Sequence, residues 1–170
     1  SASNVSLAVP RDKTYPEMEF PSNEYRLLAL FRFWHVIDKF FPYKHLIDEP
    51  WDDILVRYIP KFEQNKDAAD YQLTVQEMVA EIQDSHGGVR YPTQPSKWSE
   101  KRGRHSPAIA VKFVGDELMV NGLLEASVPL KRGEVITAID GQDVWTYGGR
   151  SARYFAHSTK QALKRILEFD

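Results

Sequence analysis

The spacing of the apolar residues changes once along this chain of 170 residues, and that change restricts the folds open to it. In the first half, apolar residues recur every three or four positions, which is the period of a buried helix face. From Pro107 onward they recur at nearly every second position, which is the period of a half-buried strand. The sequence therefore predicts an α+β fold, with a small N-terminal helical bundle followed by a β-rich domain.

The first half of the chain predicts three helices that close on one another as a bundle. Ser22 precedes the first helix as its N-cap, and Pro42 ends it. We expect Pro60 to break the second helix after Tyr58, and Asp67 to cap the third helix. The expected helices span residues 22–41, 51–58 and 67–82.

The second half predicts three strands and one helix. The Gly115-Asp116 pair separates the first two strands, and the Asp140-Gly141 pair after the third strand suits a type I′ turn. The expected strands span residues 108–114, 117–123 and 134–139, and the helix lies within residues 151–169. The predicted organisation is a tail over residues 1–21, a helical domain over 22–90, a linker over 91–106 and a β-rich domain over 107–170.

The composition excludes several classes of partner and site. The 22 basic and 24 acidic residues are scattered and leave a net charge of -2, so we expect no nucleic-acid partner. No apolar run is long enough to cross a bilayer, so we expect no transmembrane segment. The chain has no cysteine, one histidine lies in the first expected helix as a hydrogen-bonded or half-exposed residue, and three others have no partner at ligand spacing, so we expect neither a metal nor a cofactor. The histidine of the helix is His35, and the other three are His45, His105 and His157.

One segment of the second half carries a recognisable motif. Residues 130–144 begin with a leucine, continue with the Gly133-Glu134 pair, and include the run Ile-Thr-Ala-Ile-Asp-Gly over residues 136–141. This segment resembles the PDZ signature of bacterial proteases, although Glu134 replaces the more common aspartate. The alternative is an unrelated β-hairpin, because an Asp-Gly pair between apolar strands is common.

The helical half carries a second series of motifs in a matching order. The series consists of Phe41-Pro42-Tyr43, Trp51-Asp52, Ile59-Pro60, Tyr71 and the run from Asp84 to Gly88. With the PDZ-like segment, it resembles the serine peptidases of the C-terminal processing and tricorn-like family over about residues 24–169. The resemblance implies that a peptidase domain follows, that the PDZ-like domain is truncated at its C-terminal end, and that the protein is periplasmic, cell-surface or secreted.

The resemblance assigns a catalytic role to Ser85 and His86, which match the Ser-His pair of the tricorn-like branch. His86 would act as general base, because an imidazole with an unperturbed pKa of about 6.5 accepts a serine proton near neutral pH. Ser85 would orient the imidazole. Gly87 departs from the family pattern, in which a threonine usually follows the histidine.

The nucleophile and the acid of such a site would come from the missing domain, since no Gly-x-Ser-x-Gly elbow occurs in this sequence. We therefore expect the chain alone to be inactive. The alternative for the Ser85-His86 pair is a structural loop motif in which Asp84 and Ser85 close the end of the third helix. That interpretation fits the processing-peptidase branch, which uses a Ser-Lys dyad.

The PDZ-like domain predicts a binding site for a peptide or protein C-terminus. An extended peptide would add as a strand beside residues 108–111, where backbone N–H groups would hold its carboxylate, and would pack on the helix that contains Leu163. The expected contact residues are Ala108, Ile109, Ala110, Val111 and Leu163. The alternative is that this domain only packs on its neighbours.

Two functions follow from these patterns. The first is the non-catalytic N-terminal part of a serine endopeptidase, which positions peptide substrates and lends Ser85 and His86 to the active site of the following domain. The second is a non-enzymatic peptide- or ligand-binding protein on the same scaffold.

Overall fold

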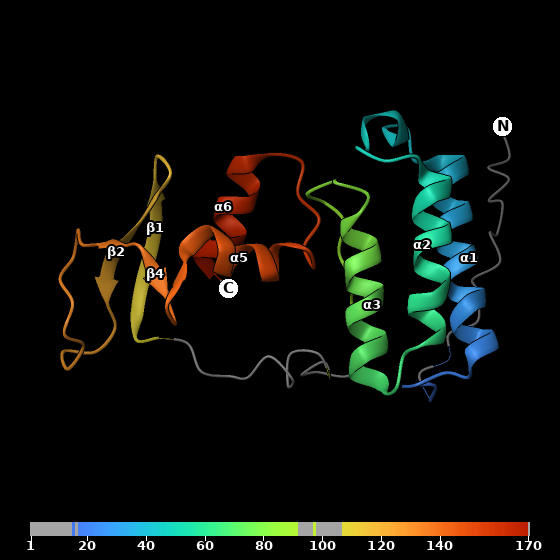
Figure 1. Cartoon of the computed structure of the whole chain (residues 1–170), viewed down its shortest axis with the longest axis horizontal. Helices are drawn as coiled ribbons and strands as arrows, with labels where there is room; N and C mark the ends of the chain where they lie inside the picture. Colours follow the sequence, from blue (N-terminus) through green and yellow to red (C-terminus); the bar gives the residue numbers. More distant parts are fainter. Residues whose placement is uncertain (1–14, 16, 92–96, 98–106, 170) are drawn as a thin grey trace, which may run out of the picture.

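The computed structural model describes residue 15, residues 17–91, residue 97 and residues 107–169. Three helices lie side by side at one end of the molecule, and small antiparallel sheets with two further helices lie at the other (Figure 1). The helices are α1 (Asn23–Phe40), α2 (Trp51–Glu63), α3 (Ala68–Ala80), α5 (Val144–Ala152) and α6 (Lys160–Phe169), and a short 3₁₀ helix η1 (Lys44–Leu46) follows α1. The expected α+β class is confirmed.

The strands form two sheets. The strands are β1 (Ile109–Val114), β2 (Glu117–Leu123), β3 (Val135–Ile136), β4 (Ala138–Ile139) and β5 (Gln142–Asp143). The first sheet has the order β1-β2-β3, and β4 pairs with β5 in the second. The single strand expected over residues 134–139 is therefore wrong, because the chain changes sheets at Thr137, whose carbonyl accepts a hydrogen bond from the Val144 N–H. Asp140 and Gly141 have φ angles of 50° and 74°, as a type I′ turn requires.

The C-terminal part contains two helices where the sequence predicted one within residues 151–169. Asp143 caps α5 by accepting hydrogen bonds from the N–H groups of Trp145 and Thr146, so this helix begins directly after β5. α6 begins after Thr159, whose hydroxyl oxygen accepts a hydrogen bond from the Ala162 N–H at 3.1 Å. Each helix therefore begins at its own capping side chain, Asp143 for α5 and Thr159 for α6.

The helical bundle has an apolar core between α1, α2 and α3. Its buried side chains are Leu30, Ile37, Trp51, Ile54, Tyr58, Phe62, Met78 and Ile82. The indole N–H of Trp34 donates to the Trp51 carbonyl at 3.1 Å, and the indole N–H of Trp51 donates to the Trp34 carbonyl at 3.0 Å. This reciprocal pair satisfies both indoles and fixes the register of α1 against α2.

The second helix continues through Pro60 to Glu63, so the expected break after Tyr58 is wrong. A buried arginine from α1 stabilises the extra turn: the Arg26 guanidinium donates to the carbonyl of Phe62 at 2.9 Å and to that of Glu63 at 3.3 Å. These carbonyls have no partner within the helix, so a cation at this end is favourable. The Phe62 side chain is buried in the same turn and adds hydrophobic stabilisation.

Of the two residues expected to cap the first and third helices, Asp67 forms a capping hydrogen bond and Ser22 does not. Asp67 caps α3, because its carboxylate accepts a hydrogen bond from the Asp70 N–H at 2.7 Å. Ser22 occupies the N-cap position of α1, but its side chain makes no capping bond. The Ser22 hydroxyl instead donates to the Glu24 carboxylate at 2.6 Å, so its expected capping role is wrong.

The β-rich part packs α5 and α6 on one face of the first sheet. Phe113, Leu118 and Val144 form the buried centre, and Leu167 of α6 packs against it. A Cβ atom on Gly148 would lie 2.8 Å from the end of the Leu167 side chain, so the glycine leaves room for Leu167 against α5. At the other end of α6, Lys160 and Lys164 reach Asp116 in the β1-β2 turn at 2.9 and 2.8 Å.

Several expected boundaries lie mostly outside the described residues, including the tail over 1–21 and the linker over 91–106. At the start of the expected linker, the Tyr91 hydroxyl donates to the Gln72 carbonyl of α3 at 2.8 Å. The chain is therefore still packed on the helical bundle at Tyr91. In the described parts of the chain, no helix combines the length and the apolar character needed to span a membrane.

The ion pairs of Asp116 predict a specific loss of stability in acid. Hydrogen bonds from Lys160 and Lys164 lower the pKa of the Asp116 carboxyl from 3.8 to about 2. A carboxyl group with a lowered pKa stabilises the folded state above its unfolded pKa and loses this effect as pH falls through the folded pKa. We expect the Tm of the wild type to fall more steeply than that of Asp116→Asn between about pH 4 and about pH 2. Thermal unfolding followed by circular dichroism measures this difference, and parallel curves would contradict the prediction.

Candidate functional site

The loop after α3 carries the Asp84-Ser85-His86 run. Gln83 has a φ of 52° and turns the chain out of the helix, and its side-chain amide donates to Asp48 at 2.8 Å. The Gly87 N–H then donates to the Asp84 carbonyl at 2.8 Å and closes a tight turn. The chain therefore changes direction after α3 through the positive φ of Gln83, because neither Gly87 nor Gly88 has a positive φ.

Gly87 is required by packing rather than by its backbone angles. A Cβ atom at this position would lie 2.6 Å from the Ile82 side chain and 3.1 Å from the Cβ of Ala156. Ala156 belongs to the segment between α5 and α6, yet it is buried in the core of the helical bundle. The missing side chain at residue 87 therefore lets the β-rich part dock against the loop.

The His86 imidazole lies on the surface, with 96% of its side chain exposed. Its Nδ1 lies 2.9 Å from a carboxylate oxygen of Asp84, and the His86 backbone N–H donates to the same oxygen at 2.9 Å. These hydrogen bonds, the backbone one first, lower the pKa of the Asp84 carboxyl. An anionic Asp84 favours the tautomer with the proton on Nδ1, which leaves Nε2 to accept a proton from outside.

Ser85 contacts the β-rich part of the molecule. Its hydroxyl lies 2.9 Å from the Ser158 hydroxyl and accepts a hydrogen bond from the Ser158 N–H at 3.0 Å. The residue that orients the imidazole is Asp84, two positions before it, and the structure gives Ser85 no hydrogen bond to His86. Ser85 instead fixes the loop to the segment before α6.

A hollow of about 390 Å³ lies beside the imidazole, and we call it the histidine hollow. Its lining includes Phe41, Tyr43, Leu46, Ile82, Asp84 and His86. The side chains of Tyr43 and Leu46 are largely exposed, and so is that of the neighbouring Phe40. The general base candidate is therefore bordered by an apolar surface that no described segment of this chain covers.

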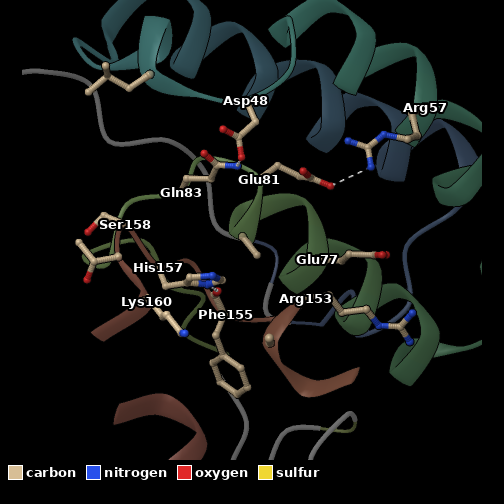
Figure 2. A pocket seen from close by; sticks show the side chains of 14 residues that line it. Asp48, Arg57, Glu77, Glu81, Gln83, Arg153, Phe155, His157, Ser158 and Lys160 are labelled. Carbon is tan, nitrogen blue, oxygen red and sulfur yellow. Dashed lines mark hydrogen bonds and ion pairs between the residues drawn. The ribbon is translucent and has the colours of Figure 1, made fainter. Parts of the chain in front are cut away.

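A charged cleft of about 620 Å³ separates α2 and α3 from the segment that joins α5 to α6 (Figure 2). Its lining includes Arg57, Glu77, Glu81, Arg153, His157 and Lys160. Figure 2 shows Arg57 pointing toward Glu81, and their side chains form an ion pair at 3.1 Å. Lys61 likewise pairs with Glu77 at 3.1 Å. Glu77 and Glu81 are thus paired with cations, whereas Asp48 accepts a hydrogen bond from the Gln83 amide. The described residues contain no cluster of acidic or histidine side chains that could hold a metal.

A third hollow of about 760 Å³, the β1 groove, is lined by strands β1 to β4 and by helices α5 and α6. Its lining includes Ile109, Val111, Val120, Val144, Leu167 and Glu168. Two of the predicted peptide contacts, Ile109 and Val111, line the groove, whereas Ala108 and Ala110 do not, because alternate residues of a strand face opposite sides. The residues of α6 that line the groove are Leu167 and Glu168, in place of the predicted Leu163.

Sequence reasoning missed three residues that shape these sites. The contact of Asp84 with the imidazole could have been expected, because an aspartate readily bonds the backbone and side chain two residues on. No local signal pairs Ser158 with Ser85 across 73 positions, or directs Glu168 toward the edge of β1. Both contacts depend on how α6 docks.

Comparison with known proteins gives no independent assignment: neither a protein-family model nor a curated protein matches this chain. The resemblance to the C-terminal processing and tricorn-like peptidases therefore stays a prediction from the motifs. The catalytic and peptide-binding roles of the named residues stay predictions with it.

The packing around Gly87 predicts that Gly87→Ala destabilises the protein. The added methyl group would contact both Ile82 and Ala156 at distances shorter than normal packing allows. We expect a loss of about 1–3 kcal/mol in the free energy of unfolding, as for overpacked cores. The matched control is Gly88→Ala, because a Cβ atom there meets nothing within 4 Å. Urea denaturation compares the two variants, and equal stability would show that the loop adjusts without cost.

Proposed function

We propose that this chain is the substrate-binding and histidine-donating part of a serine peptidase. Peptide C-termini would bind along β1, and His86 would act as general base for a serine nucleophile supplied by a peptidase domain outside this chain. The observation that carries the proposal is the exposed His86 imidazole, which Asp84 holds at 2.9 Å through Nδ1 while Nε2 faces outward. Such an arrangement positions a base for a group that approaches from another domain.

The surface around the histidine supports this geometry. A general base must come within roughly 3 Å of the group that it deprotonates, so the incoming domain has to cover this part of the loop. The histidine hollow and the exposed side chains of Phe40, Tyr43 and Leu46 offer apolar area for such an interface. Within the proposal, Ser85 has the positioning role of holding the loop to Ser158, and Asp84 orients the base.

The β1 groove supports the peptide-binding half of the proposal. Ile109 and Val111 of β1 face a hollow that is mostly lined by apolar side chains. An extended peptide bound beside β1 would place alternate side chains in this groove while its backbone adds to the sheet. The protein would then read apolar side chains near the C-terminus of its substrate.

A second candidate function is a non-enzymatic peptide- or ligand-binding protein on this scaffold. The observation that favours it is that the β1 groove lies wholly within the described residues, whereas no hydroxyl group of those residues is hydrogen-bonded to the His86 imidazole. Under this alternative, the Asp84-His86 contact only stabilises the loop.

The catalytic half of the proposal predicts a large effect of His86→Ala in the parent protein that contains the peptidase domain. We expect kcat to fall by about 10²–10⁴, because that is the usual contribution of general base catalysis. The Tm should stay unchanged, because the His86 side chain is 96% exposed. The matched control is His35→Ala, which removes an exposed imidazole from α1. Unchanged turnover in His86→Ala would refute the base role and favour a Ser-Lys mechanism.

The peptide-binding half predicts that the protein recognises a free C-terminal carboxylate. A peptide with an apolar C-terminus should bind along β1, and amidation of that C-terminus should weaken binding because the neutral amide loses charge-assisted hydrogen bonds. Isothermal titration calorimetry with matched acid and amide peptides measures the difference. Equal affinities would mean that no carboxylate is recognised, and absence of binding would leave the domain with a packing role only.

A further inference from the structure

The outer edge of β1 already has an occupant from the same chain. β1 and β2 are joined by the two-residue turn Gly115-Asp116, so hydrogen-bonded and non-hydrogen-bonded pairs alternate away from it. Phe113 pairs with Leu118 in a non-hydrogen-bonded position, and its N–H therefore points away from β2. The Glu168 carboxylate of α6 accepts a hydrogen bond from this N–H at 2.7 Å.

The carboxylate of Glu168 occupies the position at which a peptide bound beside β1 would place a carbonyl oxygen. A peptide that extends the sheet beyond β1 has to offer carbonyl oxygens to the outward N–H groups of Val111 and Phe113. Glu168 also lines the β1 groove, so its side chain lies in the path of such a peptide. Peptide and Glu168 cannot both accept from the Phe113 N–H in a sheet geometry.

We propose that Glu168 is an internal competitor that closes the distal end of the peptide site until a ligand displaces it. This inference rests on the peptide-binding function proposed above and adds its regulation. The carboxylate satisfies the Phe113 N–H in the absence of ligand and blocks the edge of β1 against other strands. A bound peptide replaces that hydrogen bond with one from its own backbone.

The rest of α6 is held by contacts that do not involve Glu168. Lys164, one turn earlier, pairs with Asp116 and donates to the Gly115 carbonyl, and Leu167 packs against Gly148. Displacement therefore requires only a rotation of the Glu168 side chain while the helix stays docked. The groove can open without unfolding of the β-rich part.

The position of Glu168 along the strand makes the competition depend on peptide length. A peptide whose carboxylate lies at Ala108 and which runs antiparallel to β1 reaches Phe113 only after ~17 Å of extended chain. A tetrapeptide ends before this point, whereas an octapeptide passes it. Only the longer peptide has to displace Glu168.

The test measures fluorescence anisotropy with a labelled tetrapeptide and octapeptide that share an apolar C-terminal sequence, against wild type, Glu168→Ala and Glu168→Gln. We expect Glu168→Ala to lower the Kd of the octapeptide about fivefold, the factor that corresponds to a net hydrogen bond of about 1 kcal/mol. Glu168→Gln keeps a neutral acceptor and should give an intermediate Kd. The tetrapeptide Kd should be the same in all three proteins, and Glu125→Gln, which changes an exposed acid after β2, should resemble the wild type.

Amide hydrogen exchange of Phe113, followed by NMR, tests the contact without any peptide. We expect a protected amide in the wild type, faster exchange in Glu168→Ala, and renewed protection when the octapeptide is added. The competitor role is overturned if the octapeptide binds wild type and Glu168→Ala equally, or if both peptides change affinity by the same factor. If no peptide binds any variant while the Phe113 amide still responds to Glu168→Ala, the proposed peptide recognition fails, and the competitor role fails with it.

Discussion

The docking of the segment between α5 and α6 against the loop after α3 is the contact on which both candidate sites depend. Ala156 completes the core of the helical bundle, and Ser158 holds Ser85 through two hydrogen bonds. Gly87 allows this approach, because a side chain there would overlap Ala156 and Ile82. With the loop fixed on this side, the His86 imidazole points to solvent and is hydrogen-bonded to Asp84.

The same segment leads directly into α6, which shapes the β1 groove. Lys160 and Lys164 anchor this helix on Asp116 at the tip of the β1-β2 hairpin, and Glu168 reaches the edge of β1. The stretch from Ala156 to Glu168 therefore contacts the loop that carries His86 at its start and lines the β1 groove at its end. The electrostatic contacts of α6 lie at the surface and weaken with salt and acid, whereas the Ala156 contact is apolar and does not.

Local patterns predicted the elements that depend on local physics. The helical spacing before residue 82, the Asp67 cap and the Asp140-Gly141 turn follow from side-chain period, a capping carboxylate and positive φ angles. The break expected at Pro60 is wrong because Arg26, 36 positions away from Phe62, stabilises the last turn of α2. The exposed position of His86 was also predictable, because a polar run between a helix end and two glycines indicates a surface loop.

The sequence by itself determined the α+β class, the helical first half, the β1-β2 hairpin and the surface position of His86, because hydrophobic period and turn chemistry act over a few neighbouring positions. The tertiary structure alone decided which side chains meet. It paired Ser85 with Ser158, placed Ala156 in the core of the helical bundle, and directed Glu168 to the Phe113 N–H. These contacts join residues as many as 73 positions apart, and such pairs are set by how helices and sheets pack rather than by any pattern within a segment.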